Sequence, residues 1–351
     1  MKQHSILQSI VLILIVVVSS FFATCDDEPS NPPPQQIDST SHSFVFFTDT
    51  LGTVLSRVND VFCLSETEAY AVGLFYVRDS TGKVIDSLTC NFARWDGVKW
   101  KLERVAPLFN GSPSFGENYS VFAFNDHDLW LAPAQHWNGF EWKIYDVNGI
   151  STGRTRKIWG SRSNDVWFAG ENGSIMHWDG ERFVRKGEIT TAANCDIWGW
   201  KDTIYVAVTD YDRVTGNRGY LVRIVNGSYV EKQFLDNGEQ VSVWGMNGTW
   251  YAGGCHSAIF FRKTGGLWNR VPLSITKCIQ AIRGTALNNV YIATSGRNLF
   301  HFNGISWREI LPLDPEAAII DGMSTVGNLV MLADSKLGNA IVYRGYQQPI
   351  K

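Results

Sequence analysis

Short runs of apolar and aromatic residues alternate with polar turn sequences along most of the chain. In the clearest stretch the pattern predicts four strands, at 156–160, 165–170, 174–178 and 181–185. Asp179-Gly180 separates the last two, and such a dipeptide supplies the positive φ angles of a tight type I′ hairpin turn. Beyond the N-terminus, no apolar i, i+3, i+4 pattern lasts for a dozen residues. The sequence therefore predicts an all-β protein.

The four-strand unit recurs seven times. Its closing element is an aromatic or aliphatic residue, usually Asp or Asn, and then Gly, with the glycines at Gly97, Gly139, Gly180, Gly227, Gly265, Gly304 and Gly345. Successive glycines lie 42, 41, 47, 38, 39 and 41 residues apart. A period near 40 with four strands per unit is typical of β-propeller blades. We predict a seven-bladed propeller over residues 43–351, with six or eight blades as alternatives.

The last blade needs a strand from elsewhere, because the chain stops shortly after the seventh unit's third strand. The segment 43–47, Ser-Phe-Val-Phe-Phe, precedes the first inner strand expected at 58–64. Adding it to the last blade would close the ring and remove an open sheet edge. The sequence thus predicts closure by the N-terminal strand.

The N-terminus reads as a secretion signal over residues 1–24, with Lys2 before an unbroken apolar run at 10–18. The Cys25 that follows resembles the acylated residue of bacterial lipoproteins, although Phe22 and Thr24 depart from the usual residues. An uncleaved membrane anchor is the alternative. An acidic cluster behind the acylated cysteine resembles a surface-export signal, which here would be Asp26, Asp27 and Glu28. We expect an outer-membrane lipoprotein displayed on the cell surface, with a periplasm-facing orientation as the alternative.

Residues 25–42 form an acidic and proline-rich tether. Pro32-Pro33-Pro34 and polar neighbours make a core impossible there and favour an extended polyproline-like chain. At about 3.1 Å per residue, the proline-rich stretch 29–43 could hold the propeller roughly 45 Å from the lipid.

Net charge and the absence of known motifs limit the classes of partner and reaction to expect. The formal net charge of −3 favours neither nucleic acid nor anionic lipid, so we expect membrane contact through the lipid anchor only. No G-x-S-x-G, H-E-x-x-H or phosphate-loop motif occurs, and no C-x-x-C spacing suggests a metal site. We therefore predict no catalytic residue, no metal and no cofactor. Cys63 and Cys90 belong to one blade and either pair or stay as buried thiols.

The repeated rings invite functional interpretations, but packing explains them better. Trp159, Trp198 and Trp244 share one inner-strand position, with Phe62, Phe122 and Arg283 equivalent, and large rings there would fill the wedge between blades. The recurrent histidines His136, His177 and His301 lie on different blades, too far apart to share a metal ion. We expect each of them to make a repeated turn-supporting hydrogen bond.

Loop length points to one rim as the binding surface. If the strands of a blade are called a to d, the a–b and c–d turns form one rim (the c–d rim) and are short. The b–c loops and the connections between blades form the other (the b–c rim), where the long insertions 74–91, 106–118 and 209–219 fall. Variable loops on a rigid scaffold commonly carry recognition. The candidate ligand-binding residues are Asp79, Lys83, Phe109, Phe115, Asp210, Tyr211, Asp212, Arg213, His256 and Arg297.

The string W-G-S-x-x-x-D-V-W-x-A-G-x-x-G-x-I-x-H-W-D-G, from Trp159 to Gly180, resembles the Trp-rich propeller repeats of secreted bacterial lipoproteins. The resemblance covers roughly 58–343 and implies a fold and a secretion route but no reaction. We therefore expect a non-catalytic module that binds a glycan or protein through the b–c rim. A carbohydrate-active hydrolase or lyase acting in the propeller mouth is the alternative.

Overall fold

The computed structural model divides the chain into two units, Met1–Asp38 and Ser39–Lys351. It describes residues 39–350 except 86–87, 189–192, 211–215, 256–257, 274–276, 297, 313–319 and 337. Cys25 and the acidic residues Asp26, Asp27 and Glu28 lie outside the described residues.

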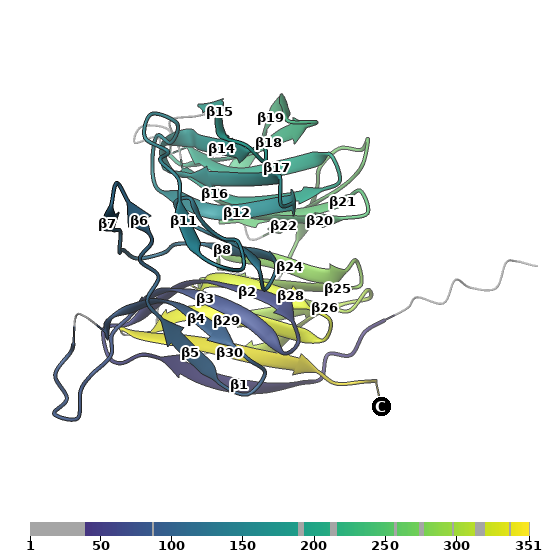
Figure 1. The fold of residues 1–351 in the computed structure, drawn as a ribbon. Helices are drawn as coiled ribbons and strands as arrows, with labels where there is room; N and C mark the ends of the chain where they lie inside the picture. The colour runs from purple at the N-terminus through teal and green to yellow at the C-terminus, as the bar shows by residue number, and fades with distance from the viewer. Residues whose placement is uncertain are drawn as a thin grey trace, which may run out of the picture. The chain divides into compact units, whose positions relative to one another are not determined.

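Seven four-stranded antiparallel sheets make up the described chain (Figure 1). From the inner strand outward, blade 1 contains β2 (Arg57–Ser65), β3 (Glu68–Phe75), β4 (Cys90–Trp95) and β5 (Trp100–Glu103). Blade 2 contains β8 (Val121–Asn125), β9 (Asp128–Leu131), β10 (Gln135–Trp137) and β11 (Trp142–Ile144). Blade 3 contains β12 (Thr155–Arg162), β13 (Asp165–Gly170), β14 (Ser174–Trp178) and β15 (Phe183–Glu188). Blades 4 and 5 contain β16 (Ala193–Trp200), β17 (Thr203–Asp210), β18 (Arg218–Val225) and β19 (Ser228–Asn237); and β20 (Gln240–Met246), β21 (Thr249–Gly254), β22 (Ala258–Lys263) and β23 (Asn269–Pro272). Blade 6 contains β24 (Ile279–Ala286), β25 (Asn289–Thr294), β26 (Asn298–Phe302) and β27 (Trp307–Pro312), and blade 7 contains β28 (Ile320–Val326), β29 (Leu329–Lys336), β30 (Asn339–Gln347) and β1 (Phe44–Leu51).

The sheets follow one another in a closed ring. Each inner strand contacts the next, in the order β2, β8, β12, β16, β20, β24 and β28, and β28 contacts β2 again. A short β6–β7 hairpin (Leu108–Phe109 and Ser112–Pro113) lies between blades 1 and 2, and one 3-10 turn spans Glu171–Gly173. The seven-bladed all-β propeller predicted from the repeat is confirmed. Within the described residues, no helix is long and apolar enough to cross a membrane.

The ring closes through the N-terminal strand, as predicted. β1 pairs antiparallel with β30 over its full length, from Phe44 opposite Gln347 to Leu51 opposite Ala340. The strand is longer than the expected 43–47. Asp49 binds the Arg344 guanidinium at 2.5 and 3.1 Å and accepts a hydrogen bond from the Trp100 indole of blade 1. The same carboxylate therefore holds β1 to blade 7 and blade 7 to blade 1.

The c–d turns are tight, but most are not type I′. Gly97, Gly139, Gly180 and Gly304 have positive φ, whereas the preceding Asp or Asn does not. That side chain instead accepts hydrogen bonds from the two backbone amides that follow the glycine, as Asp179 does from Glu181 and Arg182. Asn226-Gly227 alone among these dipeptides has both φ angles positive. The seventh marker, Gly345, is a strand residue in β30 whose open face lies against the Phe46 ring.

The inner-strand rings fill the wedge between blades. The Trp159 ring lies against Gly199 of blade 4 and the Trp244 ring against Gly284 of blade 6, so closely that a Cβ at either glycine would collide with the indole. The Trp198 indole donates to the Gly245 carbonyl of blade 5 at 2.9 Å. The packing interpretation of these tryptophans is confirmed.

The repeated histidines bind the start of the second strand rather than the turn. His136 contacts Asp128 at 2.8 Å, His177 contacts Asp165 at 2.7 Å, and His301 contacts Asn289 at 2.7 Å. Each ring also stacks on the aromatic residue opposite it in the sheet, Trp130, Trp167 or Tyr291. The repeated hydrogen bond exists, but it supports the c–d rim of the blade as a whole.

Of the two alternatives for Cys63 and Cys90, the structure shows buried thiols, and it adds a disulfide that the sequence did not predict. Cys63 and Cys90 are free and buried, while Cys255 and Cys278 form a disulfide. Cys255 follows β21 in the b–c loop of blade 5, and Cys278 directly precedes β24, so the disulfide joins two neighbouring blades at the b–c rim. Sequence spacing alone does not reveal this proximity.

Closure yields the first prediction. Phe46 faces the core shared by blades 6 and 7, whereas Val45 points to solvent. We expect Phe46→Ala to lower the melting temperature, through a loss of roughly 1.5–3 kcal/mol of unfolding free energy, and Val45→Ala to leave it nearly unchanged. A chain starting at Gly52, which lacks β1, should be insoluble or melt far below a chain starting at Ser39. Equal thermal melting curves for these two chains would contradict closure by β1.

Candidate functional site

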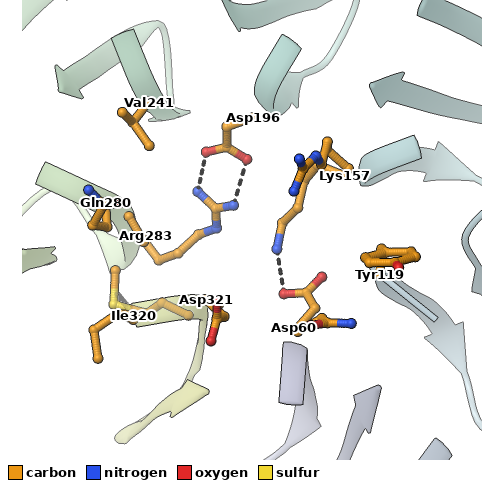
Figure 2. Close-up of a pocket in the computed structure, with 14 residues that line it drawn as sticks. Asp60, Tyr119, Lys157, Asp196, Val241, Gln280, Arg283, Ile320 and Asp321 are labelled. Atoms are coloured by element: carbon orange, nitrogen blue, oxygen red, sulfur yellow. Dashed lines mark hydrogen bonds and ion pairs between the residues drawn. The ribbon is translucent and has the colours of Figure 1, made fainter. Parts of the chain in front are cut away.

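A cavity of about 300 Å³ opens at the mouth of the central channel on the b–c rim (Figure 2). Six inner strands carry a register shift near their first residues, which leaves one residue unpaired. In five of these strands the unpaired residue lines the cavity: Asn59, Arg156, Val241, Gln280 and Asp321. Bulges re-aim side chains in this way, so the mouth is built by one repeated irregularity of the inner strands.

The residue after each bulge occupies one equivalent position around the ring. Going from blade 1 to blade 7, that position holds Asp60, Ser120, Lys157, Asp196, Ser242, Ala281 and Gly322. In blades 1 to 5 this position is polar, and these five side chains form a layer directly beneath the mouth.

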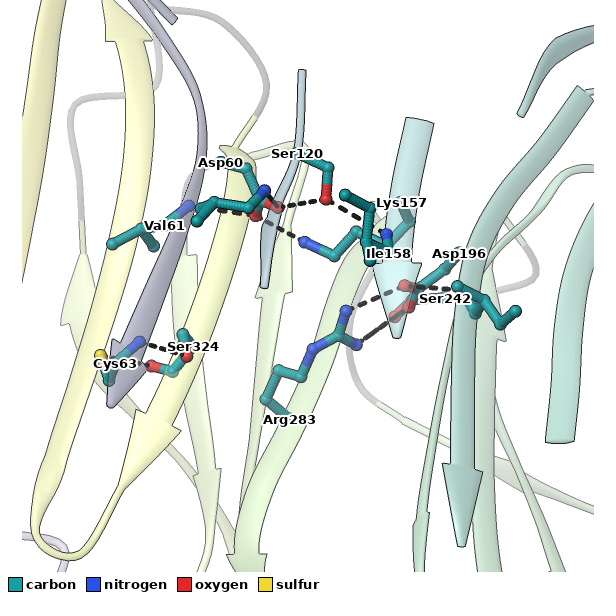
Figure 3. A network of polar contacts seen from close by, with 12 residues as sticks. Asp60, Val61, Cys63, Ser120, Lys157, Ile158, Asp196, Ser242, Arg283 and Ser324 are labelled. Atoms are coloured by element: carbon teal, nitrogen blue, oxygen red, sulfur yellow. Dashed lines mark hydrogen bonds and ion pairs between the residues drawn. The ribbon is translucent and has the colours of Figure 1, made fainter. Parts of the chain in front are cut away.

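Asp60 joins the first three blades. Its buried carboxylate accepts hydrogen bonds from the Ser120 hydroxyl of blade 2 at 2.9 Å and pairs with the Lys157 ammonium of blade 3 at 2.5 Å. The Ser120 oxygen in turn accepts the backbone N–H of Ile158 at 3.2 Å. One carboxylate thus ties three inner strands together (Figure 3).

Asp196 repeats the arrangement three blades further on. It accepts the Ser242 hydroxyl of blade 5 at 2.7 Å, and the Ser242 oxygen accepts the N–H of Ile282 of blade 6 at 2.9 Å. The cation is Arg283, which binds both carboxylate oxygens at 2.9 Å (Figures 2 and 3). Burial by itself raises the pKa of Asp196, but the Arg283 guanidinium outweighs burial and holds that pKa below its usual value. The pair is therefore ionised, bidentate and buried.

Arg283 also separates the mouth from the channel below. It occupies the inner-strand position that carries Phe or Trp in five other blades, and its guanidinium lies 5.0 Å from the Trp198 ring centre. A second cavity of about 230 Å³ lies beneath, lined by Phe62, Phe122, Trp159 and Trp198 among others. Lys157 and Arg283 line both cavities. The channel is polar above these cations and aromatic below them.

Asp321 differs from the other two carboxyls. It borders the mouth on blade 7 and, among the described residues, has no ion pair. Although the residue is open to solvent on the channel side, surrounding protein raises the pKa of its carboxyl to about 6, and the nearby Asp60 and Glu117 carboxylates raise it further. The charge of the Asp321 carboxyl thus changes near neutral pH.

The five described candidates from the sequence all lie on the b–c rim, but none lines the mouth cavity. Asp79 is used locally, since its carboxylate accepts hydrogen bonds from Thr81 and Lys83 and so shapes the hairpin tip. Phe109 belongs to the β6–β7 hairpin, and Asp210 ends the ladder of β17 with β18. Tyr211, Asp212, Arg213, His256 and Arg297 lie outside the described residues.

Arginine covers one face of each of two rings at this rim. The Arg104 guanidinium lies 3.5 Å from the ring centre of Phe115, and Arg154 lies 4.5 Å from that of Tyr119. Arginine stacks well on aromatic faces, so one face of each ring is already occupied.

Sequence reasoning missed Asp60, Lys157, Asp196 and Asp321 altogether. A signal did exist, because each of Asp60, Lys157 and Asp196 stands two residues before the repeated inner ring, at Phe62, Trp159 and Trp198. Arg283 in place of such a ring was a second signal. Neither indicated that the residues meet across blades.

Two serine–histidine–aspartate groups on the c–d rim do not resemble a hydrolase site. In blade 3, the Ser161 hydroxyl and the His177 ring both bind the Asp165 carboxylate instead of each other. Asp128 is held similarly by His136 and Ser163. A nucleophilic serine needs the histidine base beside it, so these groups support the sheet. Within the described residues, no three His, Cys, Asp or Glu side chains are placed to hold a metal ion.

Comparison with known proteins shows the fold but assigns no family. No protein-family model and no curated protein sequence matches the chain. The structure of YCF48 bound to D1 peptide is similar at 12% identity, over 86% of this chain and 97% of that chain, with a TM-score of 0.62. The WD40 β-propeller domain of Doa1 is similar at 12% identity, over 86% and 96%, with a TM-score of 0.63. YCF48 from Cyanidioschyzon merolae is similar at 12% identity, over 84% and 98%, with a TM-score of 0.57. This chain is therefore a seven-bladed propeller similar in fold to YCF48 and WD40 propellers.

The buried pair Asp196–Arg283 gives the second prediction. Arg283→Met leaves a buried carboxylate without its cation, which should lower the free energy of unfolding by about 3–5 kcal/mol. The double variant Asp196→Asn/Arg283→Met removes both charges and should regain most of that loss. Chemical denaturation of the parent protein, the single variants Arg283→Met and Asp196→Asn, and the double variant measures both effects. A double variant as unstable as the sum of the two single variants would show that the charges do not depend on each other.

Proposed function

We propose that this protein is a non-catalytic binding propeller that takes a protein or peptide ligand on the b–c rim, over the channel mouth. This proposal rests on the pairing of the charged side chains at the mouth. Asp60, Lys157, Asp196 and Arg283 neutralise one another and are held by strand backbone, which leaves a shaped polar surface rather than reactive groups.

The same observation weighs against the hydrolase or lyase alternative. Glycoside hydrolysis uses two carboxyl groups, one of them a general acid with a raised pKa. Asp321 has such a pKa. However, the two other described mouth carboxylates are each paired with a cation, Asp60 with Lys157 and Asp196 with Arg283. Removing either cation would leave a buried charge. A lone acid beside neutralised partners supports recognition better than bond cleavage.

A peptide or protein fits the site better than a glycan. Sugar recognition commonly uses an open aromatic face. The rings of Phe115 and Tyr119, at this rim, are each covered by an arginine. The mouth instead offers amide, guanidinium and carboxyl groups, which suit backbone and charged side chains. The YCF48 structure bound to D1 peptide is an example of a peptide on a similar fold.

We further propose that the propeller is exported and anchored through an acylated Cys25, with Asp26, Asp27 and Glu28 directing it to the cell surface. The Cys255–Cys278 disulfide supports an oxidising compartment, because such bonds persist mainly outside the cytoplasm. The apolar run at 10–18 before Cys25 supports export.

A binding experiment tests the ligand site. The chain from Ser39 onward should be screened against peptide and glycan arrays, and we expect peptide ligands. Asp321→Lys and replacement of 79–83 by Asn-Gly should weaken binding at least tenfold with little change in melting temperature. Glu181→Lys, on the c–d rim, is the matched control and should bind normally. Loss of binding in the control but not in the b–c rim variants would overturn the site, and glycan-only binding would overturn the ligand class.

A processing experiment tests the anchor. Cys25→Ser should abolish acylation and leave a precursor about 24 residues longer, because the lipid-dependent cleavage no longer occurs. Replacing Asp26, Asp27 and Glu28 with Ala should preserve acylation and reduce protease access on whole cells. Acylation that persists in Cys25→Ser would remove the lipoprotein proposal, and unchanged protease access in the triple variant would remove surface display.

A further inference from the structure

The N-terminal part of the propeller is fixed at the c–d rim. β30 runs from the b–c rim towards the c–d rim, and β1 pairs with it antiparallel, so β1 begins at the c–d rim. Thr40 lies there as well. Its N–H donates to the Asn303 carbonyl at 3.1 Å and its hydroxyl to the Asn288 carbonyl at 2.9 Å, in the c–d and a–b turns of blade 6. Figure 1 shows the described chain beginning on the side away from β6 and β7.

The same rim carries four exposed apolar side chains in its c–d turns. Val98, Phe140 and Ile305 directly follow the turn glycine in blades 1, 2 and 6, and Leu267 lies one position later in the c–d turn of blade 5. They are 83%, 90%, 61% and 81% exposed, in that order. Three of these turns are held rigid, since the tip amide donates to the Asp or Asn two residues before it. We call these four residues the apolar tips.

The apolar tips are not spread evenly around the ring. They occupy blades 5, 6, 1 and 2, on either side of blade 7, through which the N-terminal strand joins the ring. Blades 3 and 4, on the far side, carry Glu181 and Ser228 directly after the turn glycine. Single exposed apolar residues are common on protein surfaces. Four of them on an arc centred on the attached end of the chain distinguish that side of the c–d rim from the opposite side.

Exposed apolar side chains also occur on the b–c rim. Val54, Leu55 and Leu108 are more than half exposed. They lie in the irregular connections before β2 and around β6, and neither end of the described chain lies on that rim. They therefore serve as a matched comparison for the apolar tips.

We propose that the apolar tips contact the lipid surface that carries the anchor, so that the c–d rim of blades 5, 6, 1 and 2 rests on the membrane and the b–c rim faces away from it. This inference depends on the anchoring part of the proposed function. The segment from Cys25 to Thr40 spans roughly 45 Å when extended at about 3.1 Å per residue, and Thr40 is held at this rim. The anchor therefore keeps these turns within that distance of the lipid, at high effective concentration, and apolar side chains there can make the contact.

Contact through the apolar tips is an apolar, not an electrostatic, interaction. Lys99 and Lys263 are exposed near the tips of blades 1 and 5, but Asp96 and Glu141 are exposed beside the tips of blades 1 and 2. The charges around the arc are mixed. We therefore expect zwitterionic lipid to suffice and added salt to have little effect, because screening acts only on the charge component.

The test uses the mature chain from Cys25, coupled through that thiol to a maleimide phospholipid in phosphatidylcholine vesicles, so that the result does not depend on acylation in the cell. An environment-sensitive fluorescent amino acid replaces Phe140 in one protein and Glu181 in another. We expect the emission to shift to shorter wavelength on vesicle attachment at position 140 and not at 181. Equal emission at the two positions would overturn the inference.

Matched triple variants complete the test. With the reporter at 140, Val98→Ser/Leu267→Ser/Ile305→Ser should abolish the shift, whereas Val54→Ser/Leu55→Ser/Leu108→Ser on the b–c rim should retain it. Both triple variants change exposed side chains and should melt like the parent protein. A reporter at position 305 instead of 140 repeats the measurement if the first protein folds poorly. A shift that survives loss of the other apolar tips would also overturn the inference.

Discussion

Closure of the ring by the N-terminal strand is the constraint on which the rest of this structure depends. Without β1, β30 would expose a full row of unpaired backbone groups, and blade 7 would lack the Asp49 carboxylate that links it to Trp100 of blade 1. Closure also has a direction. Because β1 runs antiparallel to β30, the described chain enters the ring at the c–d rim, and neither of its ends lies on the b–c rim.

The free rim is shaped by a second repeated feature, the bulge near the start of the inner strands. Each bulge turns one side chain into the mouth and sets the next beneath it, where Asp60 and Asp196 each connect three blades through a serine and a cation. Buried ion pairs add little net stability compared with apolar packing, yet breaking one is costly. Their effect here is to fix the positions of the inner strands, and with them the polar surface that a ligand would meet.

The sequence predicted the features that follow from its repeat, and it missed the contacts between residues that are distant in sequence. The period of about 40 residues, the inner tryptophans and the unpaired last blade predicted the fold and its closure, since each follows from a local pattern or from counting. The mouth residues escaped because Asp60, Lys157 and Asp196 are ordinary charged residues, tens of residues apart, that converge only when the ring closes. Phe115 was placed on the correct rim, but Arg104, which covers its ring, could be identified only from the structure. The Cys255–Cys278 pairing was missed for the same reason as the mouth.

The fold does not determine which side chains the c–d turns expose. In blades 1, 2, 3 and 6 the turn is specified by an Asp or Asn, which accepts the amides, and by a glycine with positive φ, so the side chain of the residue after the glycine is not constrained by folding. Blade 3 places Glu181 there in the same turn geometry that holds Phe140 in blade 2. Folding therefore does not require apolar tips in blades 1, 2, 5 and 6. Their position on both sides of the strand that closes the ring is better explained by what that end of the molecule touches.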